Sequence, residues 1–316
     1  MTERAVGVLL PRDLPADQFR PFAQRAEALG FDELWVVEDC FFRGGVAQAA
    51  AALAMTERIR VGIGILPAAV RNAAFTAMEA ATLAELFPGR VDIGIGHGMP
   101  GWMRQVGAWP QSPLTMLGEH LDAVRAVLRG GSVDADGRYV TLHGVDLNTP
   151  PTNVPRVLAG VRGPKSLALA GRSADGTILA EPVTPEYVAE ALRHIAPTRE
   201  HRIVAYCVTV VGDDASVARD AARPALEWIG EPDWDVHIAP LPFADEFRAL
   251  RAAAADRPGF VAAMPDEWID QLAVVGTVDA ARKRIGELHD AGVTTTVLIP
   301  VGADPLAALE DLARVL

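Results

Sequence analysis

The chain has 316 residues, 50% of them hydrophobic, so it can bury one large α/β core or two ordinary ones. Its formal net charge of −12 argues against nucleic acid and anionic membrane surfaces as partners. No apolar stretch approaches the roughly 18 residues of a membrane span, and the N-terminus shows no secretory signal. The only two cysteines, Cys40 and Cys207, make neither a disulfide framework nor a zinc site, so we expect a reducing cytoplasm.

Short apolar runs alternate with helical patterns along the whole chain. Strands are predicted to begin near residues 6, 34, 60, 91, 156, 177, 203 and 294. Helices are predicted over 14–29, 46–55, 73–86, 113–128, 166–172, from 184, over 213–229, 277–291 and 304–315. Eight β/α alternations favour an α/β fold of the (β/α)8 TIM-barrel class, as a single domain over residues 1–316. The GxGxxG fingerprint of an open dinucleotide-binding sheet is missing.

Two insertions interrupt this alternation. After the fourth strand, residues 96–112 form a long loop rich in Gly, Pro and Trp, and 130–151 suggest a hairpin-like excursion with one strand at 139–142. Residues 230–270 contain many Pro and Trp residues without clean periodicity. We expect helical pieces and loops there, serving as a lid or an oligomer contact.

The most informative loop follows the strand near 156. It runs Gly160, Val161, Arg162, Gly163, Pro164, Lys165 and Ser166. Its glycines let backbone amides converge, Pro164 suits the first turn of a helix, and two cations lie beside the helix N-terminus. This pattern predicts a phosphate seat, and the alternative is a tight turn with two solvated cations.

Glycines also mark the end of the third strand, in Gly62–Ile–Gly64–Ile–Leu–Pro67. They indicate either a bulge that presses backbone against a flat cofactor ring, or small-for-large packing between barrel layers. The residues alone leave the two interpretations open.

Candidate catalytic groups lie where strands end, since barrel enzymes work at that face. Glu38 and Asp39 follow the second strand, and either could bind or protonate a substrate or simply cap the loop. His97 lies between Gly96 and Gly98 and could donate to a ring or be structural. Cys40 has no neighbouring base, and the remaining histidines lack metal-ligand spacing, so we predict no metal.

Together, several motifs resemble those of the luciferase-like flavin and deazaflavin oxidoreductases, most of all the branch similar to methylene-tetrahydromethanopterin reductase. The motifs are residues 29–39, 56–62, Arg71–Asn72, 81–86, Gly89–Arg90, 94–98, 163–167 and 169–176. The resemblance covers residues 5–180 well and 277–300 loosely.

This resemblance implies coenzyme F420, a deazaflavin, lying across the barrel top, with FMN as the alternative. It implies a non-proline cis peptide at Gly64–Ile65, in a bulge that backs the ring, with Gly96, His97 and Gly98 nearby. It also implies that the loop from Gly160 to Ser166 holds the cofactor phosphate. The chain departs from the family pattern at two places. The second strand ends in Glu38–Asp39–Cys40, where the family often has His or Asp, and Met99 follows Gly98, where relatives often have an acidic residue. Both departures affect which residues can be assigned as catalytic.

We therefore expect an oxidoreductase that moves a hydride between reduced deazaflavin and an organic substrate, with reduction of a C=C or C=N bond. Glu38, Asp39 or His97 would deliver the proton. The alternatives are an FMN-dependent monooxygenase, a cofactor-free phosphate-binding lyase or isomerase, and a non-catalytic flavin-binding relative. We also expect a small-molecule or modified-peptide substrate and a homodimer.

Overall fold

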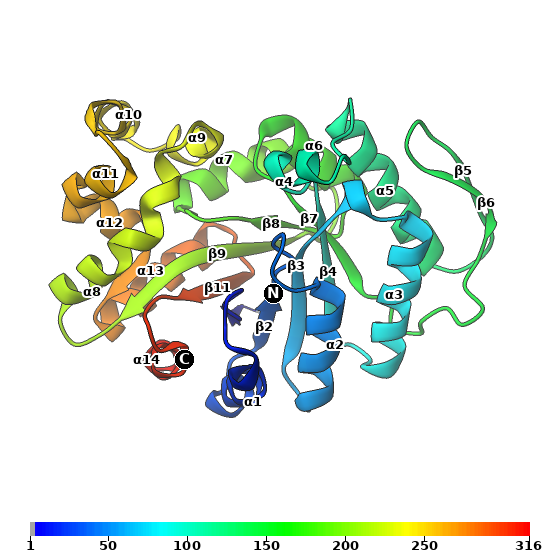
Figure 1. Cartoon of the computed structure of the whole chain (residues 1–316), viewed down its shortest axis with the longest axis horizontal. Helices are drawn as coiled ribbons and strands as arrows, with labels where there is room; N and C mark the ends of the chain where they lie inside the picture. The colour runs from blue at the N-terminus through cyan, green and yellow to red at the C-terminus, as the bar shows by residue number, and fades with distance from the viewer. Residues whose placement is uncertain (1–3) are drawn as a thin grey trace. The chain divides into compact units, whose positions relative to one another are not determined.

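Eight parallel strands alternate with helices in the computed structural model, which describes residues 4–316 (Figure 1). The strands are β1 (Ala5–Leu9), β2 (Glu33–Val36), β3 (Arg60–Pro67), β4 (Val91–Gly96), β7 (Arg156–Gly160), β8 (Gly176–Leu179), β9 (Arg202–Val211) and β11 (Thr295–Pro300). Each of the eight barrel strands predicted from the sequence is confirmed, and the fold class is the (β/α)8 barrel. A short extra strand, β10 (Val274–Gly276), had no sequence signal of its own.

The helices follow the predicted pattern with some differences. They are α1 (Phe19–Leu29), α2 (Gly45–Met55), α3 (Ala73–Leu86), α4 (Pro100–Gln105), α5 (Pro113–Leu128), α6 (Pro164–Ser173), α7 (Pro185–Ile195), α8 (Ala215–Ala222), α9 (Asp235–Ile238), α10 (Ala244–Ala253), α11 (Arg257–Ala263), α12 (Asp266–Leu272), α13 (Val278–Ala291) and α14 (Pro305–Ala313). The 3₁₀ helices are η1 (Ala16–Gln18), η2 (Ala68–Val70), η3 (Arg223–Gly230) and η4 (Pro232–Trp234).

Contacts divide the chain into two compact units, and the expectation of a single domain stays a prediction. One unit comprises residues up to 32, 179–193 and 203–316, and the other comprises 33–178 and 194–202. In the second unit the parallel strand order is β2-β3-β4-β7-β8. Ile63, Ile93 and Val157 pair across three of these strands and are buried, as expected when helices cover a parallel sheet.

The amino ends of strands in this unit hold a buried ionic network. Arg202 bonds to Glu33 and to Asp92, whose side chains are 4% and 3% exposed. Arg60 donates to Asp92 at 2.9 Å, and the Trp35 indole donates to Glu33 at 2.9 Å. Because these charges pair among themselves at the amino ends, they stabilise the unit at the end opposite to that used for chemistry in such barrels.

The insertion after β4 contains α4, α5 and a hairpin of β5 (Val133–Asp136) and β6 (Thr141–Val145), which projects past α5 (Figure 1). The excursion is confirmed, but the strand predicted at 139–142 is wrong by two residues, since Tyr139 and Val140 lie in the turn. The predicted loop at 96–112 contains α4, for which Pro100 supplies the first-turn residue.

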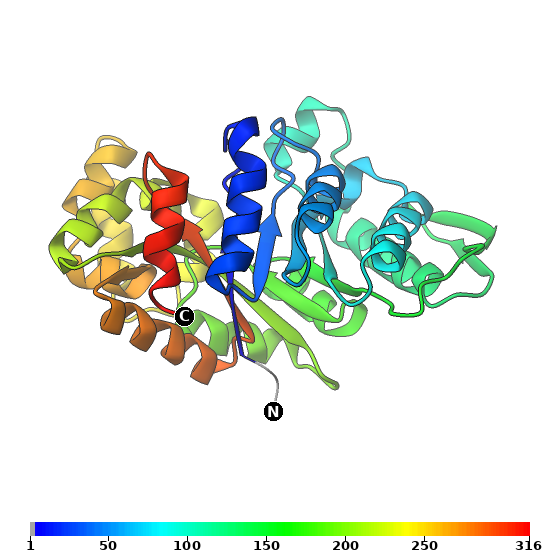
Figure 2. The same cartoon turned by 90° about the horizontal axis from the view of Figure 1, so that it is seen from below.

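The first unit contains the strand order β10-β9-β11-β1. Helices α1 and α14 lie side by side in it, joined by an Arg25–Glu310 ion pair (Figure 2). Residues 230–270 form short helices packed around Phe247, whose ring meets Phe260 edge-on at 5.1 Å. The helix predicted over 213–229 ends at Ala222 and continues as η3, because Pro224 cannot donate to the α-helical ladder. Among residues 4–316 no helix is long and apolar enough to cross a bilayer.

Candidate active site

The end of β2 is fixed by an ion pair between Glu38 and Arg71. Arg71 Nη2 lies 2.8 Å from Glu38 Oε1 and 2.7 Å from Oε2, and Nε lies 3.2 Å from Oε1. The Gly45 amide donates to Oε2 at 2.6 Å, and Arg71 Nη1 contacts Glu79 at 3.1 Å. Both carboxylate oxygens of Glu38 therefore accept hydrogen bonds, and the pair joins the loop after β2 to the loop after β3.

Asp39 and Cys40 follow Glu38 and are half-buried. Burial raises the pKa of the Cys40 thiol, and the neighbouring Glu38 and Asp39 carboxylates raise it further. The thiol is thus held in its protonated form, which is a poor nucleophile. This supports the interpretation of Cys40 as a chemically inert residue and leaves Asp39 as the candidate acid at this position.

The end of β3 carries the bulge and the cis peptide that the resemblance implies. The pairing register with β4 shifts between Ile63 and Leu66, and the Gly64–Ile65 peptide is cis, so both predictions are confirmed. A second non-proline cis peptide, Cys40–Phe41, was not predicted.

The glycines around this bulge make room for other side chains. A Cβ on Gly160 would lie 2.3 Å from Ile65 Cγ2, and one on Gly96 would lie 3.2 Å from Ile65 and 2.8 Å from the Gly160 oxygen. A Cβ on Gly62 would lie 2.5 Å from the Trp35 ring. Packing against Trp35 therefore explains Gly62, and Gly64 belongs to the bulge, whose contact with a cofactor ring stays a prediction.

The loop from Gly160 to Ser166 leads directly from β7 into α6. Gly163 is the N-cap residue and no side chain caps the helix, so the first amides of α6 are not used by a capping group. A Cβ on Gly163 would meet nothing within 4 Å, and Lys165 is exposed. Open space, first-turn amides and a cation together fit an anionic group such as a phosphate.

His97 and Ser166 are brought together although 69 residues separate them. His97 Nε2 lies 3.1 Å from Ser166 Oγ, which joins the end of β4 to the first turn of α6. Burial lowers the pKa of the His97 imidazole, so the ring is neutral near pH 7. Nδ1 is buried, and an interaction of the ring with the Pro113 backbone partly opposes this shift.

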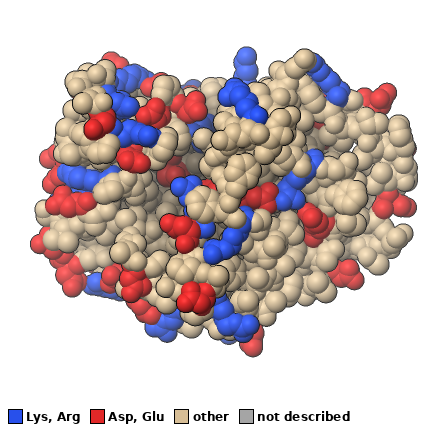
Figure 3. Space-filling model, in the orientation of Figure 1, with Lys and Arg blue, Asp and Glu red and all other residues tan. Residues whose placement is uncertain are grey.

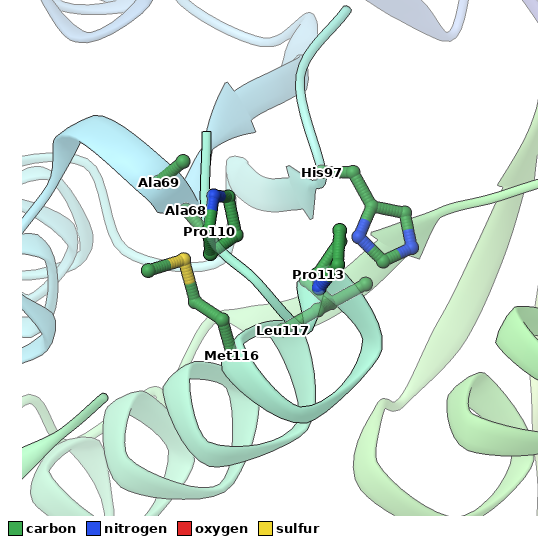
Figure 4. Close-up of a pocket in the computed structure, with 7 residues that line it drawn as sticks. All are labelled: Ala68, Ala69, His97, Pro110, Pro113, Met116 and Leu117. Carbon is green, nitrogen blue, oxygen red and sulfur yellow. The ribbon is translucent and has the colours of Figure 1, made fainter. Parts of the chain in front are cut away.

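A narrow, largely apolar hollow, too small to admit a water molecule, lies beside His97 (Figure 4). It is lined by Ala68, Ala69, His97, Pro110, Pro113, Met116 and Leu117. His97 is the one titratable group among these lining residues. Trp102 and Trp109, the two tryptophans of the insertion after β4, are half-buried and do not line this hollow. The Arg104 guanidinium lies 5.4 Å from the Trp109 ring centroid.

Sequence reasoning gave no role to two residues that adjoin the predicted site. Arg71 appeared only as part of a motif, although its position just after a strand end was a usable signal. His120 lies on α5 one turn after Met116, is 1% exposed, and has an Nε2 without a partner among the described residues. Burial, and secondly the charge of Arg71, lowers the pKa of His120 to about 4. In residues 4–316 no group of three or more His, Cys, Asp or Glu could hold a metal.

Comparison with known proteins identifies the family. The model of the luciferase-like monooxygenase family matches residues 3–295. The 5,10-methylenetetrahydromethanopterin reductase of Methanolobus tindarius is 31% identical, over 96% of this chain and 97% of that protein.

Solved structures agree in fold. The coenzyme F420-dependent tetrahydromethanopterin reductase of Methanopyrus kandleri superposes with a TM-score of 0.83 at 23% identity, covering 98% of this chain and 97% of that one. An F420-dependent secondary alcohol dehydrogenase gives 0.77 at 22% identity, covering 99% and 98%. The chain therefore belongs to the luciferase-like monooxygenase family and is an oxidoreductase.

Proposed function

We propose that this chain is a coenzyme F420-dependent oxidoreductase that reduces a C=C or C=N bond of an organic substrate. Its relatives named for F420 dependence support this choice. The main structural observation in its support is the N-terminus of α6, which no side chain caps. Lys165 lies in the first turn of this helix, and Ser166 contacts His97. Coenzyme F420, when bound, supplies the hydride.

The chain's own residues bind, orient and protonate in this proposal. Gly163, Lys165 and Ser166, together with Arg162, hold the anionic tail through backbone amides and positive charge. The bulge at Gly64 and Ile65, with Gly96 and Gly98, supports the ring. Asp39 delivers the proton to the substrate, and His97, neutral near pH 7, serves as a hydrogen-bonding group beside it.

We assign Glu38 a positioning part rather than proton delivery. Its oxygens accept from Arg71 and from Gly45, so a proton on either oxygen would displace one of these donors. Holding Arg71 in place, Glu38 fixes the two loops that flank the site.

Binding of the purified protein to F420 and to FMN, followed by fluorescence quenching, tests the proposal. We expect tighter binding of F420, and saturable binding of FMN alone would replace the proposal with the monooxygenase alternative. A lyase or isomerase acting through a Schiff-base lysine is disfavoured, because the two lysines lie on helices: Lys165 is exposed in the first turn of α6, and Lys283 is exposed on α13.

We also propose a homodimer that pairs through α3. Phe75, Met78 and Leu86 are 65%, 46% and 65% exposed on this helix, and the surface over α3 and α5 in Figure 3 is mostly uncharged. Apolar patches of this kind mark protein contacts. Phe75→Glu should shift the sedimentation coefficient towards the monomer, while Val217→Glu, at an equally exposed site on α8, should not.

We further propose a cytoplasmic location. The free thiols Cys40 and Cys207 support a reducing compartment.

A further inference from the structure

The tip of the β5–β6 hairpin is held by one carboxylate from α5. Glu119 Oε1 accepts from the Arg138 amide at 3.0 Å, and Oε2 accepts from the Tyr139 and Val140 amides at 2.7 and 3.0 Å. The Gly137 amide closes the turn onto the Val140 carbonyl at 2.9 Å. A Cβ on Gly137 would lie 2.5 Å from Glu119 Oε2, so only glycine leaves room for this clamp.

The clamped tip reaches the segment that walls the hollow beside His97. The Ser112 amide donates to the Tyr139 hydroxyl at 2.7 Å. The Arg138 side chain bonds to Gln111, and its guanidinium lies 5.3 Å from the centre of the Tyr139 ring. The hairpin thus contacts this segment through two adjacent residues of its tip.

The composition of the wall explains why this contact matters. Pro110 and Pro113 line the hollow and have no N–H to donate, so backbone amides in 110–113 come only from Gln111 and Ser112. The Ser112 amide is also the N-cap amide of α5, and no side chain caps that helix. Tyr139 therefore holds one of the two backbone donors that can fix the wall.

We propose that the β5–β6 hairpin is a strut, and that Tyr139 and Glu119 are positioning residues that set the wall of the hollow beside His97. Whether this wall borders bound cofactor or substrate rests on the proposed function, but the strut itself does not. A hairpin that merely covered α5 would need neither the three-amide clamp nor the hydroxyl contact to Ser112.

Hydrogen exchange of the full chain tests the strut directly. Tyr139→Phe removes only the hydroxyl, and we expect amide exchange in residues 108–113 to rise about fivefold, the loss of one net hydrogen bond. Glu119→Gln, with one acceptor oxygen in place of two, should raise it by a similar factor. The double variant should show less than the product of the two factors, because both act through one chain of contacts. Thr141→Val, exposed on β6, should leave this exchange unchanged.

Ligand binding supplies the second readout. If the wall must be in place for binding, saturating F420 should slow amide exchange at 108–113, in the wild type and in both single variants, because a ligand that binds only the closed wall lowers the population of the open one. Unchanged exchange at 108–113 in both single variants without ligand would refute the strut, and exchange that bound F420 does not slow would refute the positioning role. Should the wild-type chain not bind F420 at all, the proposed function fails while the exchange result still decides the strut.

Discussion

Arg71 contacts both carboxylate oxygens of Glu38 and joins two loops that end neighbouring strands. The side chains are 20% and 14% exposed, so the pair is only partly screened by water. Without Arg71, the Glu38 carboxylate would keep only the hydrogen bond from the Gly45 amide.

We predict that Arg71→Met lowers the free energy of unfolding by about 2 kcal/mol, less than for a fully buried pair because water reaches Glu38. Urea denaturation measures this. The double variant Arg71→Met/Glu38→Gln should be more stable than Arg71→Met alone, since it removes the unpaired charge. Arg4→Met breaks an exposed pair with Asp290 and should cost less than about 0.5 kcal/mol. If Arg71→Met lowered the free energy of unfolding as little as Arg4→Met, water would be compensating for the loss of the Arg71–Glu38 ion pair.

The cations at the start of α6 should control cofactor affinity. Replacing both Arg162 and Lys165 with alanine should weaken F420 binding about tenfold at low salt, and less at high salt, because the interaction is electrostatic. Fluorescence titration measures the Kd. Arg172→Ala removes a cation from the last turn of the same helix and serves as the matched control. Equal affinity in the double variant and the wild type would remove the phosphate assignment.

Two glycines of this same loop should differ in how much stability an added methyl group costs. Gly160→Ala places a Cβ against Ile65 and should cost about 1–3 kcal/mol of stability, whereas Gly163→Ala meets open space and should cost a few tenths. Adding Ile65→Ala to Gly160→Ala should recover part of the overpacking loss. Thermal unfolding measures both, and no recovery would show that Ile65 is not the obstacle.

His120 should make stability depend on pH. Its folded pKa of about 4 lies below its ordinary value of 6.5, so the unfolded chain binds the extra proton between these pH values. Stability therefore rises with pH across this window, is complete above it, and falls on acidification by roughly 3 kcal/mol in total.

Equilibrium unfolding between pH 4 and 6.5 checks this contribution. His120→Leu should reduce the slope of the unfolding free energy by about 1.4 kcal/mol per pH unit, while above pH 7 the two proteins should differ by a constant amount. His201, whose pKa burial also lowers to about 4, keeps part of the slope in the variant. An unaltered slope would mean that His120 is protonated in the folded protein.

Features that depend on local chemistry were predictable from the sequence. Apolar runs located all eight barrel strands, and the glycines and cations of 160–166 located the loop that begins α6. What the sequence could not predict depends on partners far apart in the chain. Arg202 meets Asp92 across 110 residues, and no local pattern links them. Likewise, Glu119 holds backbone amides of a turn, which carry no side-chain signature.

In the candidate site, too, single residues could be predicted from the sequence but their contacts could not. His97 and Ser166 were each singled out from neighbouring glycines or charge, but their contact follows from the pairing of β4 with β7. Arg71 was visible as a residue after a strand, yet its partner Glu38 could be assigned only from the fold. The end of α8 at Ala222 was not predicted, although Pro224 signals a helix break, because the amphipathic pattern continues beyond Pro224.

Ile65 lies against Gly94, Gly96 and Gly160, so a side chain of the protein already fills the space that these glycines leave. The interior beneath the bulge is consequently complete before anything binds above it. Cofactor can bind and dissociate without creating a cavity in the hydrophobic core. The apoprotein should therefore keep its structure through repeated cycles of cofactor binding and release.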